Sequence, residues 1–270
     1  MKKLEHPMTG DLLFKMYFVQ YPDLLKNLIS EVLGIKIEDM KEFTITNPEI
    51  PPDIIGKKFC VLDINLKVNG QLINLEVQVN VNEDFVVRTV YYWARLFSST
   101  LPKGGNYKDL PRVVIISILD SPSFKSNDYH SEYLLIEKTN HTVLTDKIDL
   151  LYFELSKIKS AIDKTNNLEL WLRLFYAKTE EDLNKIEELE VPIMKEAVSA
   201  YRQVSESEKF QEMQRMYHKI SMDEASALGY AEEKGRAEGK AEGIAEERAR
   251  MEMLLAEKDA EIARLLKKNV

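Results

Sequence analysis

The stretch from Phe59 to Val79, FCVLDINLKVNGQLINLEVQV, decides the fold of this chain. Apolar and polar residues alternate on both sides of Asn69-Gly70, as they do in strands with one buried face. Asn-Gly is typical of a two-residue type I′ turn, because both central residues of that turn need positive φ. The stretch therefore predicts a β-hairpin.

The turn also predicts the register of this hairpin. Counting outward from Asn69-Gly70 places Asn65 opposite Asn74 and Asp63 opposite Glu76, and such pairs have Cβ atoms roughly 4.5–5.5 Å apart. Two opposed carboxylates repel each other, but together with an amide or carbonyl oxygen they form a hard oxygen site for Mg²⁺. The alternative is a solvated hairpin face whose acids are screened by water. In either case one polar face would hold Asp63, Asn65, Asn74, Glu76 and Gln78.

The segments around the hairpin predict a small α/β core with the order α-β-β-α-β. The spacing of apolar residues indicates helices over residues 11–33 and 84–99, the first ending at Gly34. The run VVIISIL within residues 112–119 is typical of a strand covered on both faces. A strand, a helix and a second strand imply a right-handed crossover and a parallel pair. We therefore expect a small mixed sheet flanked by helices.

The chain divides by pattern into a core over residues 1–120, a mainly helical extension over 121–204 and a charged helical tail over 205–270. We expect the extension to pack on the core. Because apolar residues of the tail follow a heptad spacing, it predicts a short coiled coil and a homo-oligomer; a solvated, partly frayed helix is the alternative. The seam consists of Ile244, Met251, Leu255, Ile262 and Leu265, interrupted by Arg248 and Lys258.

Composition excludes several classes of protein. The 270 residues are 44% hydrophobic and 30% charged, which is typical of a folded chain. Cys60 is the only cysteine, which excludes intramolecular disulfides and cysteine-cluster zinc sites and favours a reducing cytoplasm. No window approaches the roughly 20 apolar residues of a membrane span, and we expect neither a signal peptide nor a membrane partner.

The net charge of −8 argues weakly against nucleic acid as a partner. However, residues 1–120 hold 14 Lys and Arg against 15 Asp and Glu, so most of the negative charge lies in the remainder. The region with the carboxylate pair is nearly neutral and is compatible with a DNA-binding face.

Four segments resemble the Rpn family of recombination-promoting nucleases, which are also classed as transposases and belong to the PD-(D/E)XK nuclease superfamily. Their order and spacing along most of the chain carry the resemblance. The segments are Asp11 to Lys15, Gly56 to Lys58 leading to Asp63, Asn69-Gly70 leading to Glu76-Val77-Gln78, and Arg88 with Tyr91-Tyr92.

The resemblance implies a magnesium-dependent endonuclease that cleaves DNA in recombination or element mobility. Asp63 and Glu76 would be metal ligands. Gln78 stands where the superfamily usually has a lysine that orients or activates the attacking water. Glutamine can orient water, but it cannot carry charge or accept the proton, so the general base is not identified. A bound cation would lower the pKa of its water.

Three further residues are candidates for contact with DNA. Arg88 and Tyr92 combine a cation and an aromatic ring on one helix, which suits a DNA backbone and a stacked base; half-buried tyrosines and a solvated arginine are the alternative. Lys15 is a candidate phosphate contact or a lysine at the edge of the core. A catalytically idle DNA-binding or assembly protein that keeps the nuclease fold is the second functional hypothesis, and a nuclease acting on RNA is the third.

Overall fold

The computed structural model describes residues 2–47, 63–79, 81–101, 104–159 and 161–268. It divides into two compact units, Met1–Gln214 and Arg215–Val270, and each is described by itself. The helices, 3-10 turns and strands are α1 (Asp11–Gln20), α2 (Pro22–Leu33), η1 (Ile37–Asp39), β1 (Phe43–Ile45), β2 (Ile64–Val68), β3 (Gln71–Gln78), α3 (Phe85–Ser99), η2 (Tyr107–Asp109), β4 (Val113–Leu119), β5 (His130–Tyr133), β6 (Ile148–Glu154), η3 (Leu155–Lys157), α4 (Asn167–Tyr176), α5 (Glu180–Glu187), α6 (Pro192–Ser205) and α7 (Glu208–Lys268).

The first unit is built on a mixed six-stranded sheet with the order β1-β2-β3-β4-β6-β5. β3, β4 and β6 are parallel to one another, whereas β1, β2 and β5 join antiparallel at the two sides. The connection from β3 through α3 to β4 is the predicted crossover between parallel strands. The predicted α/β fold with a small mixed sheet flanked by helices is confirmed.

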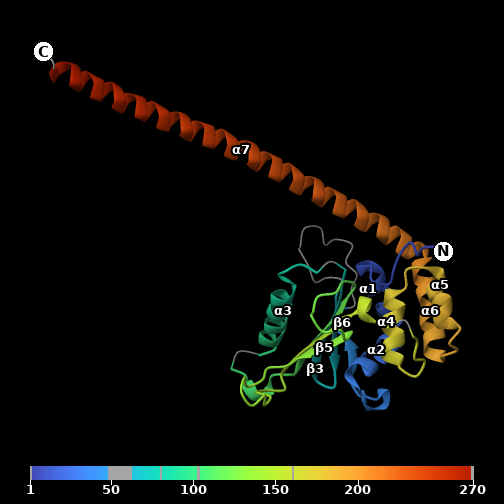
Figure 1. The fold of residues 1–270 in the computed structure, drawn as a ribbon. Helices are drawn as coiled ribbons and strands as arrows, with labels where there is room; N and C mark the ends of the chain where they lie inside the picture. Colours follow the sequence, from blue (N-terminus) through green and yellow to red (C-terminus); the bar gives the residue numbers. More distant parts are fainter. Residues whose placement is uncertain (1, 48–62, 80, 102–103, 160, 269–270) are drawn as a thin grey trace. The chain divides into compact units, whose positions relative to one another are not determined.

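Helices cover both faces of the sheet. α3 lies on one side, and α1, α2, α4 and α6 lie on the other (Figure 1). Ile64, Leu66, Ile73 and Leu75 point to the side of the larger helical group and belong to the main core. Because side chains alternate along a strand, the residues between them face α3. That side has a second, smaller core around Phe85.

The predicted helix over residues 11–33 is two helices, so this prediction is corrected. α1 ends at Gln20 and α2 begins at Pro22. Tyr21 between them has φ −122° and ψ 69°, outside the helical region, because a proline disfavours helical geometry in the residue before it. Pro22 itself suits the first turn of α2, where its missing N–H leaves no bond unmade. The predicted stop at Gly34 is confirmed by a left-handed φ of 63°.

Residues 121–204 are not mainly helical from their start, because they contribute β5 and β6 to the sheet. β6 pairs along its whole length with β4, so the predicted boundary at residue 120 falls between two neighbouring strands. Helices α4, α5 and α6 follow as expected and share the main core with α1 and α2. The tertiary pairing of β6 with β4, whose paired residues precede it by 35 positions, is the feature that sequence pattern alone did not reveal.

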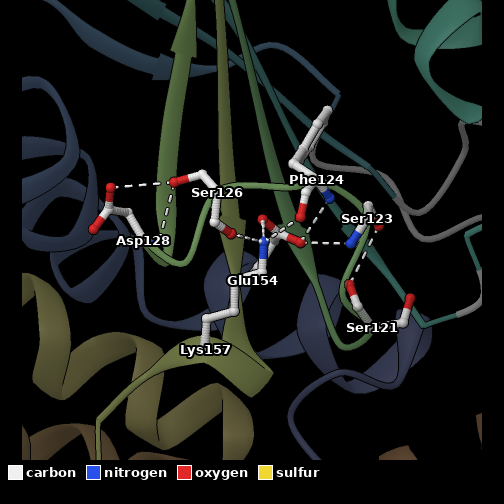
Figure 2. Close-up of polar contacts among 7 residues, drawn as sticks. All are labelled: Ser121, Ser123, Phe124, Ser126, Asp128, Glu154 and Lys157. Atoms are coloured by element: carbon white, nitrogen blue, oxygen red, sulfur yellow. Dashed lines mark hydrogen bonds and ion pairs between the residues drawn. The ribbon is translucent and has the colours of Figure 1, made fainter.

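A buried ion pair fastens the loop after β4 to the end of β6 (Figure 2). Glu154 is 1% exposed, and its Oε1 accepts hydrogen bonds from the backbone N–H groups of Ser123 and Phe124 at 2.5 and 3.1 Å. Lys157 Nζ lies 2.5 Å from Glu154 Oε2 and donates to the carbonyls of Phe124 and Ser126, both at 2.7 Å. Both charges are thus paired, as buried charges must be.

In the second unit the described residues all belong to α7, from Arg215 onward. The helix runs through Gly229, Gly235, Gly239 and Gly243 without a break. Four members of the predicted seam, Ile244, Met251, Leu255 and Ile262, have 46–61% of their surface exposed within one chain; the side chain of Leu265 lies outside the described part. Across the residues that the structure describes, every helix is too short or too polar to span a bilayer.

Candidate functional site

The hairpin has the predicted turn and register. Asn69 and Gly70 have φ of 47° and 77°, as a type I′ turn requires, and Asn65 pairs with Asn74. The last paired residue of β2 is Ile64, opposite Leu75. Asp63 is therefore the next residue outward on one strand, as Glu76 is on the other. The predicted strand residues 59–62 lie outside the described residues.

Glu76 is a buried carboxylate, with only 6% of its surface exposed. It pairs with Ser117 of β4 in parallel register, and Ser117 Oγ donates a hydrogen bond of 2.7 Å to Glu76 Oε1. Burial and the neighbouring charge of Asp63 raise the pKa of Glu76 to about 7, although the Ser117 hydrogen bond and the charge of Arg88 act in the opposite direction. A hairpin face screened by water is excluded at this position.

Asp63 is held through its main chain. Its carbonyl accepts hydrogen bonds from Lys15 Nζ and Asn47 Nδ2, each at 2.9 Å. Asn47 also accepts a 2.8 Å hydrogen bond from the backbone N–H of Asn65, so one side chain ties together both residues that flank Ile64. These contacts fix the chain where it enters β2.

Lys15 is fully buried on α1, and its ammonium also donates to the carbonyl of Asn47. The phosphate contact of Lys15 stays a prediction. The contacts of Lys15 with the carbonyls of Asn47 and Asp63 join α1 to the segment that carries Asp63.

Gln78 lies on the same face of β3 as Glu76 and meets the first turn of α3. Arg88 Nη2 donates a hydrogen bond of 2.7 Å to Gln78 Oε1. The guanidinium of Arg88 lies over the ring of Phe85, 5.5 Å from its centroid, and Phe85 is fully buried between the sheet and α3. The start of α3 is thereby anchored beside the carboxylate pair.

Tyr92 follows Arg88 by one helical turn and is half-buried, and its ring lies 5.8 Å from that of the more exposed Tyr91. The structure therefore gathers Asp63, Glu76, Gln78 and Arg88 at one place, with Tyr92 farther along α3. Lys15 contacts the carbonyl of Asp63.

Sequence reasoning missed Ser117 and Asn47. Ser117 had a signal: it is the single polar residue in the otherwise apolar run VVIISIL, and such a residue inside a fully buried strand needs a partner. Asn47 had none, because only the folded chain brings it beside Asp63.

The residues present fit a divalent metal ion such as PD-(D/E)XK nucleases generally use. Among the described residues no three His, Cys, Asp or Glu side chains cluster closely enough to hold a metal by themselves. Mg²⁺ does not need such a cage, since it is commonly bound through one or two carboxylates, several waters and substrate phosphates. The raised pKa of Glu76 beside the Asp63 charge shows a carboxylate pair that a divalent cation would stabilise in its ionised form.

Comparison with known proteins agrees with this geometry. The model of one family, described as PD-(D/E)XK nuclease family transposase, matches residues 8–231. This range includes the whole sheet, α3 and the predicted site residues. No curated protein and no solved structure gives a significant match. The chain belongs to the PD-(D/E)XK nuclease family transposases.

Proposed function

We propose that this protein is a magnesium-dependent endonuclease that hydrolyses phosphodiester bonds in DNA, in recombination or in the movement of a genetic element. One observation carries the proposal. Glu76 is buried next to Asp63 with its pKa raised to about 7. Glu76 lies on β3 and Asp63 directly precedes the adjacent strand β2 of a nuclease-family fold. Carboxylates with strongly shifted pKa values cluster at functional sites, because burying such a group lowers the stability of the fold and such burial is retained where function needs it.

In the proposed reaction Asp63 and Glu76 would hold Mg²⁺. When bound, the ion would supply a water of lowered pKa and neutralise charge on the phosphate. Ser117 keeps Glu76 oriented by its hydrogen bond to Oε1. Lys15 and Asn47 keep the backbone at Asp63 in place. The Glu76 carboxylate and the main chain that carries Asp63 are thus positioned before substrate arrives, which lowers the cost of reaching the transition state.

We propose α3 as the DNA-facing helix. It carries Arg88 and Tyr92, and its exposed apolar residues include Tyr91 at 60% and Val87 at 71% exposed. Aromatic rings on a helix can stack on bases, and Arg88 supplies positive charge beside the DNA while its hydrogen bond goes to Gln78. Because phosphate contacts release counterions, DNA binding should weaken steeply with salt.

We also propose that α7 joins copies of the chain. The exposed seam residues Ile244, Met251, Leu255 and Ile262 have the spacing of a coiled coil, and an isolated helix with four glycines is a weak structure without a partner. Two copies would supply two active sites, which is the simplest way to cut both DNA strands. The single cysteine fits action in the cytoplasm.

The experiment that tests the nuclease is plasmid cleavage by the purified full chain with Mg²⁺ and with EDTA. We expect nicked and linear products only with the metal, and none from Asp63→Ala or Glu76→Ala. Glu132→Ala, which changes an exposed glutamate of the edge strand β5, is the matched control and should cut normally. Full activity in both site variants would refute the proposed site. An inactive wild-type chain that still binds DNA would favour the idle DNA-binding protein instead.

A further inference from the structure

The hydrogen bond between Arg88 and Gln78 determines which way the Gln78 amide points. A guanidinium carries five N–H donors and no acceptor. The amide oxygen of Gln78 must therefore face Arg88, 2.7 Å from Nη2. The –NH₂ group of the same amide then points away from the guanidinium. Chemistry settles this orientation, although the oxygen and nitrogen of an amide otherwise look alike.

Arg88 is well placed to hold this orientation. It lies in the first turn of α3, its guanidinium lies over the ring of Phe85, and Phe85 is fully buried with its ring 6.0 Å from that of Tyr152 in β6. The charge of Arg88 also reaches Glu76 and lowers the pKa of that carboxyl. The guanidinium thus lies near the carboxylate pair and packs on Phe85, a residue of the second core.

We propose that Arg88 is a positioning residue that makes Gln78 a hydrogen-bond donor in the reaction, and that the acceptor is a non-bridging oxygen of the DNA phosphate under attack. The inference rests on the proposed nuclease function. An N–H group aimed at a phosphate oxygen stabilises the negative charge that develops there. Gln78 then shares with lysine the ability to donate, and it takes no proton from the attacking water. Arg88 acts through Gln78 and does not itself bind the phosphate backbone.

A double-mutant cycle tests this coupling. Arg88→Met removes the donor but keeps an aliphatic side chain against Phe85. With Gln78 present we expect kcat to fall ~10- to 100-fold, as is usual when the partner that orients a site residue is lost, with KM nearly unchanged. Arg88→Lys, which can still donate to the amide oxygen, should recover part of that loss. In a Gln78→Lys background the same Arg88→Met change should cost less than about 3-fold, because lysine donates in any orientation. An equal loss in both backgrounds would overturn the proposal.

DNA binding distinguishes positioning from direct contact. The measurement is fluorescence anisotropy with labelled duplex DNA in EDTA over a range of salt concentrations. We expect Arg88→Met to leave the salt dependence of binding unchanged. A slope lowered by about one, together with a raised KM, is the signature of a lost phosphate contact and would overturn the inference.

A readout without cleavage separates this inference from the nuclease proposal. In glutamine-labelled protein the side-chain amide signal that disappears in Gln78→Lys belongs to Gln78. Arg88→Met should shift that signal, whereas Arg95→Met, which changes an exposed arginine two turns along α3, should leave it in place. An unmoved Gln78 signal in Arg88→Met overturns the proposed contact even if the wild-type chain cuts DNA. A failure of the wild type to cut DNA counts against the nuclease alone.

Discussion

Replacing Glu76 with glutamine should change how the stability of the metal-free protein depends on pH. The pKa of Glu76 is raised from 4.5 to about 7 in the folded chain, so the folded state favours the protonated carboxyl. The penalty for ionising it is absent below pH 4.5, grows as the pH rises through 7 and is constant above that. Each pKa unit corresponds to about 1.4 kcal/mol, so linkage gives a destabilisation of about 3 kcal/mol at pH 8 and below about 1 kcal/mol at pH 5.

Glu76→Gln removes this titration but retains an oxygen that can accept the hydrogen bond of Ser117. In EDTA, the wild type should lose about 2.5 kcal/mol more than the variant between pH 5 and pH 8. The assay is urea unfolding followed by tryptophan fluorescence, since Trp171 is fully buried in the main core. Glu132→Gln, at an exposed position, should keep the wild-type pH dependence. If Glu76→Gln follows the wild type in parallel at every pH, the buried ionisation and the reasoning built on it are wrong.

Three other changes test separate parts of the structure. Gln78→Glu should lower the cleavage rate more than Gln78→Lys, because glutamate offers no donor and adds a third carboxylate to the pair; equal, wild-type rates in both would show that Gln78 does not touch the reaction. Truncation after Gln214 keeps Phe210, which is buried in the main core, and should lower the mass per particle in light scattering; an unchanged mass would rule out α7 as the assembly element. Lys157→Met leaves the Glu154 carboxylate buried without its cation and should cost about 3 kcal/mol in urea unfolding; an unchanged urea midpoint would show that this ion pair contributes nothing, and Glu154→Gln added to Lys157→Met should recover part of the loss.

Local sequence was enough for the hairpin and its register. Asn69-Gly70 admits one tight turn, and a strand period of two then assigns every following residue to a face and a partner. The crossover to β4 followed from similar reasoning, because the run VVIISIL between helical segments is apolar except for Ser117 and needs cover on both faces. The positions of Asp63, Glu76 and Gln78 in the hairpin could therefore be predicted before the fold was known, whereas their proposed roles came from the family resemblance.

Two predictions from apolar periodicity were wrong. One missed the helix break before Pro22, and the other missed the strand β6. An apolar side that continues through Tyr21 indicated one helix, although Pro22 restricts the residue before it. β6 was missed because its apolar run is short and its partner β4 is distant in sequence. Apolar periodicity and turn residues are local features, so they do not indicate which distant strand completes a sheet.

The sequence by itself determined that Asp63 and Glu76 are the next residues outward from the paired residues Ile64 and Leu75 of the hairpin, because strand geometry is local and periodic. Only the tertiary structure decided the burial, the hydrogen-bond partners and the neighbouring charges of these residues. Ser117 reaches Glu76 from a third strand, Arg88 reaches Gln78 from a helix, and Lys15 reaches the carbonyl of Asp63 from the first helix. Burial, hydrogen bonding and the pKa of Glu76 depend on these neighbours in space, because desolvation and Coulomb interactions follow distance and packing rather than position along the chain.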